Sequence, residues 1–320
     1  SRAYYQRKGE LSLLKIAEHI ENFIKLPHFC RYLQITATPY SLFLQPDGTV
    51  QLREGEEASP WLPRYTGLVP IHSRYIGGRQ YYELSEDENS MYSCLFQPVS
   101  DLCIGILSDR NEWYLESKAH SENLDPLNYA VVSYLFAAAI RTIQVKKNAN
   151  KKYYSSCLIH CEISKKNHAW QEELISGIIE DIKQAFLNKG NADLHILDLE
   201  SEAYESMRQS NELGNRYELI NEIFPSFAEV EAEVKHILEY NDYTINVVNS
   251  EEPGKVATLL NENGQLRLEQ ALNFFIGGSI LDRGITIDNM LCFFYGRDPK
   301  KFQMDTVLQH ARMYGARDKE

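Results

Sequence analysis

The stretch FFIGGSILDRG, residues Phe274–Gly284, decides how the fold of this chain is interpreted. An apolar run enters a pair of glycines, and an Arg-Gly step follows shortly afterwards. Because glycine has no Cβ, its backbone can approach a ligand closely, and successive N–H groups at such a turn suit a phosphate. A lone Gly-Gly pair is usually only a turn, so its meaning depends on the sequence around it.

Further short apolar runs lie on both sides of this stretch. Met290–Tyr295 follows it, and Leu158–His160 and Thr244–Val248 precede it. Near-continuous apolarity over a few residues is typical of parallel strands that are covered on both faces. These runs therefore predict an α/β fold with a parallel sheet.

Helix signals separate the runs. Asp125-Pro126 combines a capping residue with a proline at the first helical position, and Ser226–Glu229 has the form of a capping box. Asn167 is predicted to cap another helix, and Leu194–Leu199 is predicted as the strand that follows it. A strand, a helix and a strand in succession indicate a parallel sheet flanked by helices, with extra helices as an insertion.

The first residues of the chain have a weaker pattern. Apolar residues from Leu13 to Ile24 recur at helical spacing, and a short strand is expected at Leu33–Ile35. The tetrapeptide Thr36-Ala37-Thr38-Pro39 follows directly. The chain begins with Ser1 and not with Met, so we expect a fragment of a longer protein.

The composition changes between residues 47 and 124, where tyrosines, prolines and acidic residues are frequent. Tyr75–Gly78 with Tyr81-Tyr82 indicates either a hairpin or a ligand loop. We therefore expect three parts: residues 1–46, an irregular or β insert at residues 47–124, and a main α/β part at residues 125–320.

The overall composition is that of a globular protein, with 43% hydrophobic and 24% charged residues. The net charge of −12 argues against a surface coated in basic residues, although a narrow basic groove for nucleic acid remains compatible with it. Six scattered cysteines without a signal peptide indicate reduced thiols and a cytoplasmic location. No run is long enough to span a membrane, so we expect no membrane partner.

Taken in order, these motifs resemble the late motifs of superfamily-two helicases. Thr36-Ala37-Thr38-Pro39 looks like the motif that closes the first motor lobe, the Gly-Gly…Arg-Gly stretch like the fifth motif, and Gln309–Arg317 like the sixth. A closer resemblance is to the helicase-associated Z-one domain, which is found beside such motors in bacterial restriction and defence operons. Ala311 stands where that family usually has glycine. The matching positions are Gly277, Gly278, Leu281, Arg283, Gly284, Thr286, Gln309, Arg312, Gly315 and Arg317.

The resemblance implies the second, RecA-like lobe of a nucleic-acid-dependent ATPase that acts as a helicase or translocase in a restriction or phage-defence system. It implies that Arg312 is an arginine finger on the γ-phosphate and that Arg317 and Gln309 act beside it. The alternative for Arg312 is a purely structural role as a helix-terminal arginine that pairs with a carboxylate. The remaining implied roles are nucleotide binding by Arg283 and Gly284, nucleic-acid binding by Gly277, Gly278, Ser279, His160 and Ser164, and coupling between lobes by Thr36, Ala37 and Thr38.

The chain has no Gly-x-x-x-x-Gly-Lys-Ser/Thr loop, because Gly254-Lys255 is followed by Val256 and lacks the upstream glycine. We therefore expect this fragment alone to be inactive towards ATP and to bind no cofactor. ATP and Mg²⁺ would act in a longer parent, with the missing N-terminal lobe, DNA and restriction or defence subunits as partners. The alternative is a non-catalytic scaffold that keeps the motor fold to bind DNA or a partner protein.

Two other chemistries were weighed. Cys157, His160, Cys161 and His168 contain zinc-ligand residue types, but strand alternation places Cys157 and Cys161 on one face and His160 on the other. A second close cysteine pair is also missing, so we expect no metal site. The basic cluster is equally compatible with a solvated loop and with a phosphate contact, and consists of Lys146, Lys147, Lys151 and Lys152.

Overall fold

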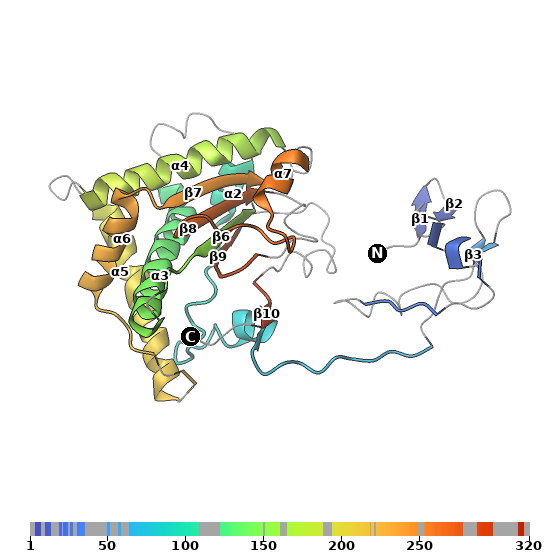
Figure 1. Ribbon diagram of the computed structural model, residues 1–320, viewed down its shortest axis with the longest axis horizontal. Helices are drawn as coiled ribbons and strands as arrows, with labels where there is room; N and C mark the ends of the chain where they lie inside the picture. Colours follow the sequence, from blue (N-terminus) through green and yellow to red (C-terminus); the bar gives the residue numbers. More distant parts are fainter. Residues whose placement is uncertain are drawn as a thin grey trace. The chain divides into compact units, whose positions relative to one another are not determined.

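A computed structural model gives the fold of the chain (Figure 1). The chain divides into two compact units, of which the first contains Ser1–Ile71 and the second contains His72–Phe302 and His310–Glu320. The residues that the structure describes are 4–7, 10–13, 19–20, 22–24, 26–27, 31–35, 50–51, 57–58, 64–108, 122–149, 151–160, 165–187, 194–217, 219–220, 222–248, 253–277, 287–296 and 313–316.

The centre of the second unit is a four-stranded parallel sheet with the strand order β7-β8-β6-β9. Its strands are β6 (Ser155–His160), β7 (Tyr243–Val248), β8 (Leu272–Gly277) and β9 (Met290–Tyr295). Each contains one of the predicted apolar runs, so the predicted parallel α/β sheet is confirmed. Every residue of the two central strands, β6 and β8, is buried, which accounts for the apolar runs Cys157–Ile159 and Phe274–Ile276 within them.

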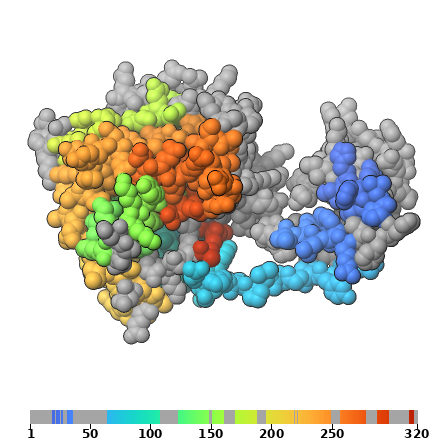
Figure 2. All heavy atoms as spheres, in the orientation of Figure 1, coloured from blue at the N-terminus to red at the C-terminus, as the bar shows by residue number. Residues whose placement is uncertain are grey.

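A much smaller sheet belongs to the same unit. The strand β5 (Tyr75–Ile76) pairs antiparallel with β10 (Gly315–Ala316), and a π-helical turn, η3 (Arg79–Glu83), follows β5. In Figure 2 the red atoms of the segment around β10 lie against the cyan atoms of this early segment. Of the two alternatives for Tyr75–Gly78 with Tyr81-Tyr82, the hairpin is wrong, because β5 pairs with a distant strand and a helical turn follows it.

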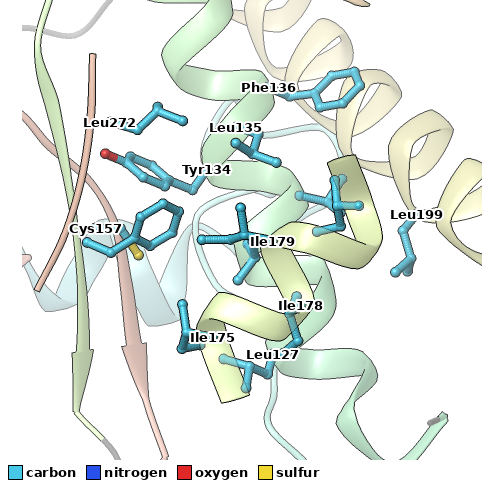
Figure 3. Packing of buried hydrophobic residues seen from close by; sticks show 14 of the residues in the cluster. Leu127, Tyr134, Leu135, Phe136, Cys157, Ile175, Ile178, Ile179, Leu199 and Leu272 are labelled. Carbon is cyan, nitrogen blue, oxygen red and sulfur yellow. The ribbon is translucent and has the colours of Figure 1, made fainter. Parts of the chain in front are cut away.

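One face of the parallel sheet is covered by helices. They are α2 (Asp101–Ser108), α3 (Asp125–Ala149), α4 (Lys165–Leu187), α5 (Leu194–Arg216) and α6 (Phe227–Glu239), with a 3-10 turn, η5 (Glu122–Leu124), before α3. A single hydrophobic cluster joins these helices to the sheet. Figure 3 shows Tyr134 of α3 pointing toward Cys157 and Leu272. The Tyr134 ring also meets Phe274 edge-on, with ring centroids 4.9 Å apart.

The opposite face is covered by less structure. Leu158 and Phe275 of the central strands pack there with α7 (Pro253–Leu259) and Leu266 in a second hydrophobic cluster. Met313, which directly precedes the β10 region, packs at the margin of this cluster together with Phe293. Alternation along β6 therefore sends Cys157 and Ile159 to the helical face and Leu158 to the α7 face, as a strand requires.

Asn273 holds the amino-terminal ends of three strands together. Its side chain is fully buried, and its Nδ2 donates to the backbone carbonyls of Ser155 at 2.9 Å and Gln270 at 2.7 Å. Its Oδ1 accepts from the Thr244 hydroxyl at 3.2 Å and from the Glu269 N–H at 2.9 Å. A buried amide must find such partners, and here they belong to β6, to β7 and to the turn before β8.

Several local predictions were also tested. The capping box is confirmed, since the Ser226 hydroxyl accepts from the Glu229 N–H and the Glu229 carboxylate accepts from the Ser226 N–H. The strand predicted at Leu194–Leu199 is wrong, because these residues begin α5. The helix α4 already begins at Lys165, so Asn167 lies inside it and does not cap it. Three successive helices therefore separate β6 from β7, and they form the predicted helical insertion.

The first unit departs further from the predictions. Leu13 ends β2 (Glu10–Leu13), which pairs antiparallel with β1 (Tyr4–Arg7), and helix is described only at residues 19–20 and 22–24. Leu33–Ile35 is not in a strand. A second antiparallel pair joins β3 (Val50–Gln51) to β4 (Glu57–Ala58). The domain boundaries after residues 46 and 124 remain predictions.

Candidate functional site at the carboxyl edge of the sheet

The last residues of three strands lie next to one another at the carboxyl edge of the sheet. His160 ends β6 and is paired in register with Tyr295, the last residue of β9. Gly277 ends β8 on the other side of β6, one residue past the paired positions Ile159 and Ile276. In open parallel sheets, ligands bind outside the carboxyl ends of strands where successive strands lie on opposite sides of a central one. This edge, where β8 and β9 flank β6, meets that description.

His160 is the titratable side chain at the centre of this edge. Its side chain is fully buried, and its ring meets that of Tyr295 nearly edge-on, with centroids 5.4 Å apart. Its backbone carbonyl accepts from the Gly296 N–H at 3.0 Å, which extends the β6–β9 pairing past the last strand residue. The imidazole is thus enclosed within the edge, and its role as a nucleic-acid contact remains a prediction.

The segments that carry the helicase-like motifs continue from these strand ends. Residues 161–164 follow β6, residues 278–286 follow β8, and residues 297–312 follow β9. Gly277 is described and is buried at the end of β8. The other predicted site residues lie outside the described residues, and these are Thr36, Ala37, Thr38, Ser164, Gly278, Ser279, Arg283, Gly284, Gln309, Arg312 and Arg317.

The sequence interpretation missed the surroundings of β10. Gly315, one of the sixth-motif positions, lies opposite Ile76 in the β5–β10 pair. Beside it, the Tyr314 ring lies 5.9 Å from the Tyr81 ring, and Tyr75 and Tyr82 are also among its neighbours. Burial, together with Tyr82 and the neighbouring tyrosines, raises the pKa of Tyr314 above its usual value. The end of the sixth motif is therefore embedded in a cluster of tyrosines.

Comparison with known families identifies this part of the chain. The Z1 domain profile matches residues 126–319, which is more than half of the chain. The chain belongs to the Z1 domain family. The matched region begins within the first turn of α3 and includes the whole parallel sheet and β10, whereas β5 and η3 lie before it. No curated protein and no solved structure matches the chain.

The described part of this Z1 protein contains neither a metal-binding cluster nor a membrane-spanning helix. Among the described residues, no three His, Cys, Asp or Glu side chains lie close enough together to hold a metal ion. No helix there is both long and apolar enough to cross a bilayer. Two lysines of the basic cluster are engaged by α6, since Lys146 pairs with Glu233 at 2.7 Å and Lys147 with Glu229 at 3.1 Å.

Proposed function

We propose that this Z1 domain is the second, RecA-like lobe of a nucleic-acid-dependent ATPase that unwinds or moves along DNA in a cytoplasmic restriction or phage-defence system. The observation that carries the proposal is the carboxyl edge of the parallel sheet. The segments with Gly278, Arg283 and Arg312 continue directly from the ends of β8 and β9. Motor lobes of this class bind nucleotide and nucleic acid at such strand ends.

In this function each motif has a defined task. Arg312 donates to the γ-phosphate as charge spreads over it in the transition state, and Arg317 and Gln309 complete that wall of the nucleotide site. Arg283 and Gly284 shape the loop beside it. The backbone at Gly277 and Gly278 and the hydroxyl of Ser279 face nucleic-acid phosphates, which fix position without reading sequence. ATP with Mg²⁺ would bind between this lobe and a first lobe that carries the phosphate loop.

The test is Arg312→Ala in the longer protein that contains both lobes. A finger acts mainly on the transition state, so turnover should fall by about 10³-fold while nucleotide affinity stays comparatively intact. Arg312→Lys should recover little of the turnover, because an ammonium cannot reproduce the planar fork of a guanidinium. Lys301→Ala serves as the control for general damage.

Two results would contradict the proposal. Near-normal turnover in Arg312→Ala, combined with early melting, would make Arg312 a structural ion-pair residue. A longer protein that binds DNA but shows no ATPase activity would favour a non-catalytic scaffold. If phosphates are the main contact, DNA binding should be insensitive to sequence and should weaken steeply as the salt concentration rises.

A further inference from the structure

We propose that residues Tyr75–Glu83, here called the strap, position the sixth motif and that Tyr314 is the residue through which they act. The strap consists of β5, the Gly77-Gly78 pair and η3. It lies before the region matched by the Z1 domain profile, so it is an addition to the family's motifs. The inference rests on the proposed function of Arg312, which is three residues from Gly315 in the sequence.

The described end of the sixth motif is anchored on two sides. Met313 packs against the margin of the hydrophobic cluster on the α7 face of the parallel sheet. The next residue, Tyr314, contacts the strap, where its ring lies 5.9 Å from that of Tyr81 and its hydroxyl lies close to Gly78. Residues 313 and 314 therefore fix this segment between the main sheet and the strap.

Backbone contacts reinforce the tyrosine contacts. Ile76 lies opposite Gly315 and Tyr75 opposite Ala316 in the antiparallel pair. The Tyr81 hydroxyl also donates a long hydrogen bond of 3.5 Å to the carbonyl of Met313. An isolated two-stranded pair of this length has little stability of its own. Side-chain contacts must therefore contribute most of what holds the β5–β10 pair together.

The glycines of the strap show how close this approach is. Gly78 has φ −53° and ψ −32°, a conformation that any residue adopts, so its backbone does not require glycine. A Cβ placed on it would lie only 3.3 Å from the Tyr314 hydroxyl oxygen. The close approach of the Tyr314 hydroxyl therefore favours glycine at residue 78. A Cβ at residue 78 therefore requires the Tyr314 hydroxyl to shift by a few tenths of an ångström, and a larger side chain such as leucine adds further bulk at this contact.

The chemistry of an arginine finger explains why such fixing matters. The guanidinium must meet the γ-phosphate in the geometry of the transition state, and a misplacement of about 1 Å can cost about 10²-fold in rate. The described anchors on Met313, Tyr314 and Gly315 lie between Arg312 and Arg317 in the sequence. The effect that we propose for the strap is to limit how far both arginines shift. Tyr314 is a positioning residue, since it acts through the arginines and contacts no reacting group.

The experiment compares Gly78→Leu and Tyr314→Ala with Tyr314→Phe in the longer protein. The first two variants should lower kcat by about 10²-fold with KM nearly unchanged, because they displace the finger without removing it. Tyr314→Phe keeps the ring and should retain most of kcat. Gly105→Leu is the matched control, because nothing lies within 4 Å of a Cβ at that exposed helical position. Arg312→Ala gives the reference for complete loss of the finger.

Hydrogen exchange provides a second readout that does not depend on catalysis. Backbone amides around residues 313–316 should exchange faster in Gly78→Leu and Tyr314→Ala, while those of β8 keep the wild-type rate and show that the fold is intact. Unchanged exchange at residues 313–316 in both variants would contradict the proposal that the strap positions the sixth motif. Faster exchange with normal kcat, when Arg312→Ala is inactive, would also overturn it but leave the proposed function standing. Near-normal turnover in Arg312→Ala would contradict both the positioning role of the strap and the proposed function.

Discussion

Strands β8 and β5 belong to the same unit but are held in opposite ways. β8 has six residues, all buried, and pairs with a neighbour on each side. β5 has two residues, pairs with β10 on one side, and leaves Tyr75 40% exposed. Burial of apolar area is the dominant stabilising term in folding, so β8 should open only when the whole unit unfolds. β5 should open at a much lower free energy.

Because the parallel sheet and the β5–β10 pair differ in burial, they are suited to different roles. The carboxyl ends of β6, β8 and β9 form a rigid edge because their strands are fixed by the core of the unit. The β5–β10 pair depends on a few tyrosine contacts and can open locally, as elements with little buried apolar surface do. Contacts that open without global unfolding can be lost while the sheet stays folded. The comparison therefore makes stability measurements informative about function.

The largest expected effect comes from removing a ring in each region. Phe274 is fully buried against Tyr134, so Phe274→Ala should lower the free energy of unfolding by about 3–5 kcal/mol. Phe96 is 45% exposed and contacts Tyr82 of the strap edge-on at 5.3 Å, so Phe96→Ala should cost only about 0.5 kcal/mol, as for a surface position. Urea unfolding of both variants measures the difference. Equal losses would mean that the strap is part of the same cooperative core.

Sequence patterns revealed the sheet because its strands are defined locally. The runs at Phe274–Ile276 and Met290–Tyr295 are short and nearly continuously apolar, and those at Leu158–His160 and Thr244–Val248 are rich in β-branched and aliphatic residues, which is typical of parallel strands. Once these strands are recognised, the rule for parallel sheets places His160 and Gly277 at one edge. That much of the candidate site followed from the sequence.

The errors have physical causes. A short apolar run such as Leu194–Leu199 fits a strand and a buried helix equally well, and the structure selects the helix because Ile196, Leu199 and Ala203 are buried at helical spacing. The β5–β10 pair has two residues in each strand, which is too few for a periodicity. A Cβ at residue 78 would lie close to the Tyr314 hydroxyl. Such a contact joins segments that are far apart in the chain, so it leaves no local sequence pattern.

The second prediction compares two side-chain amides. Asn273 is fully buried and joins β6, β7 and β8, so Asn273→Ala leaves buried backbone groups without partners and should cost about 2–3 kcal/mol. Gln80 of the strap accepts one hydrogen bond from the Gly77 N–H at 3.0 Å and is partly buried. Gln80→Ala should cost about 0.5–1 kcal/mol in global unfolding. Its main effect should be faster hydrogen exchange in the strap.

The outcome that would contradict this comparison is a reversal of the two losses. If Gln80→Ala lowered the urea midpoint as much as Asn273→Ala, opening of the strap would be coupled to unfolding of the sheet. The strap would then be fixed as rigidly as the sheet edge. Local adjustment of the sixth motif would no longer be available to it.

The smallest expected effect concerns pH and involves a third kind of contact, the exposed cap of α6. Hydrogen bonds from Ser226, and then Lys147, lower the pKa of Glu229 from 4.5 to about 2. A carboxyl whose pKa is depressed on folding contributes stability above its unfolded value, and that contribution disappears as pH falls through the folded value. The contribution of Glu229 should therefore be complete above pH 4.5 and lost by about pH 2.

Glu229→Gln isolates this contribution because glutamine keeps an oxygen acceptor for Ser226 but carries no charge for Lys147. The melting temperature of the variant should lie below that of the wild-type chain at neutral pH, and the two should converge as pH approaches 2. Glu173→Gln, on the exposed side of α4, is the matched control and should show no such convergence. Because α6 packs on α3 behind the main sheet, the loss should appear in global unfolding. Exchange in the strap by local opening should stay unchanged at the same pH, and a parallel change there would show that the strap opens together with the core.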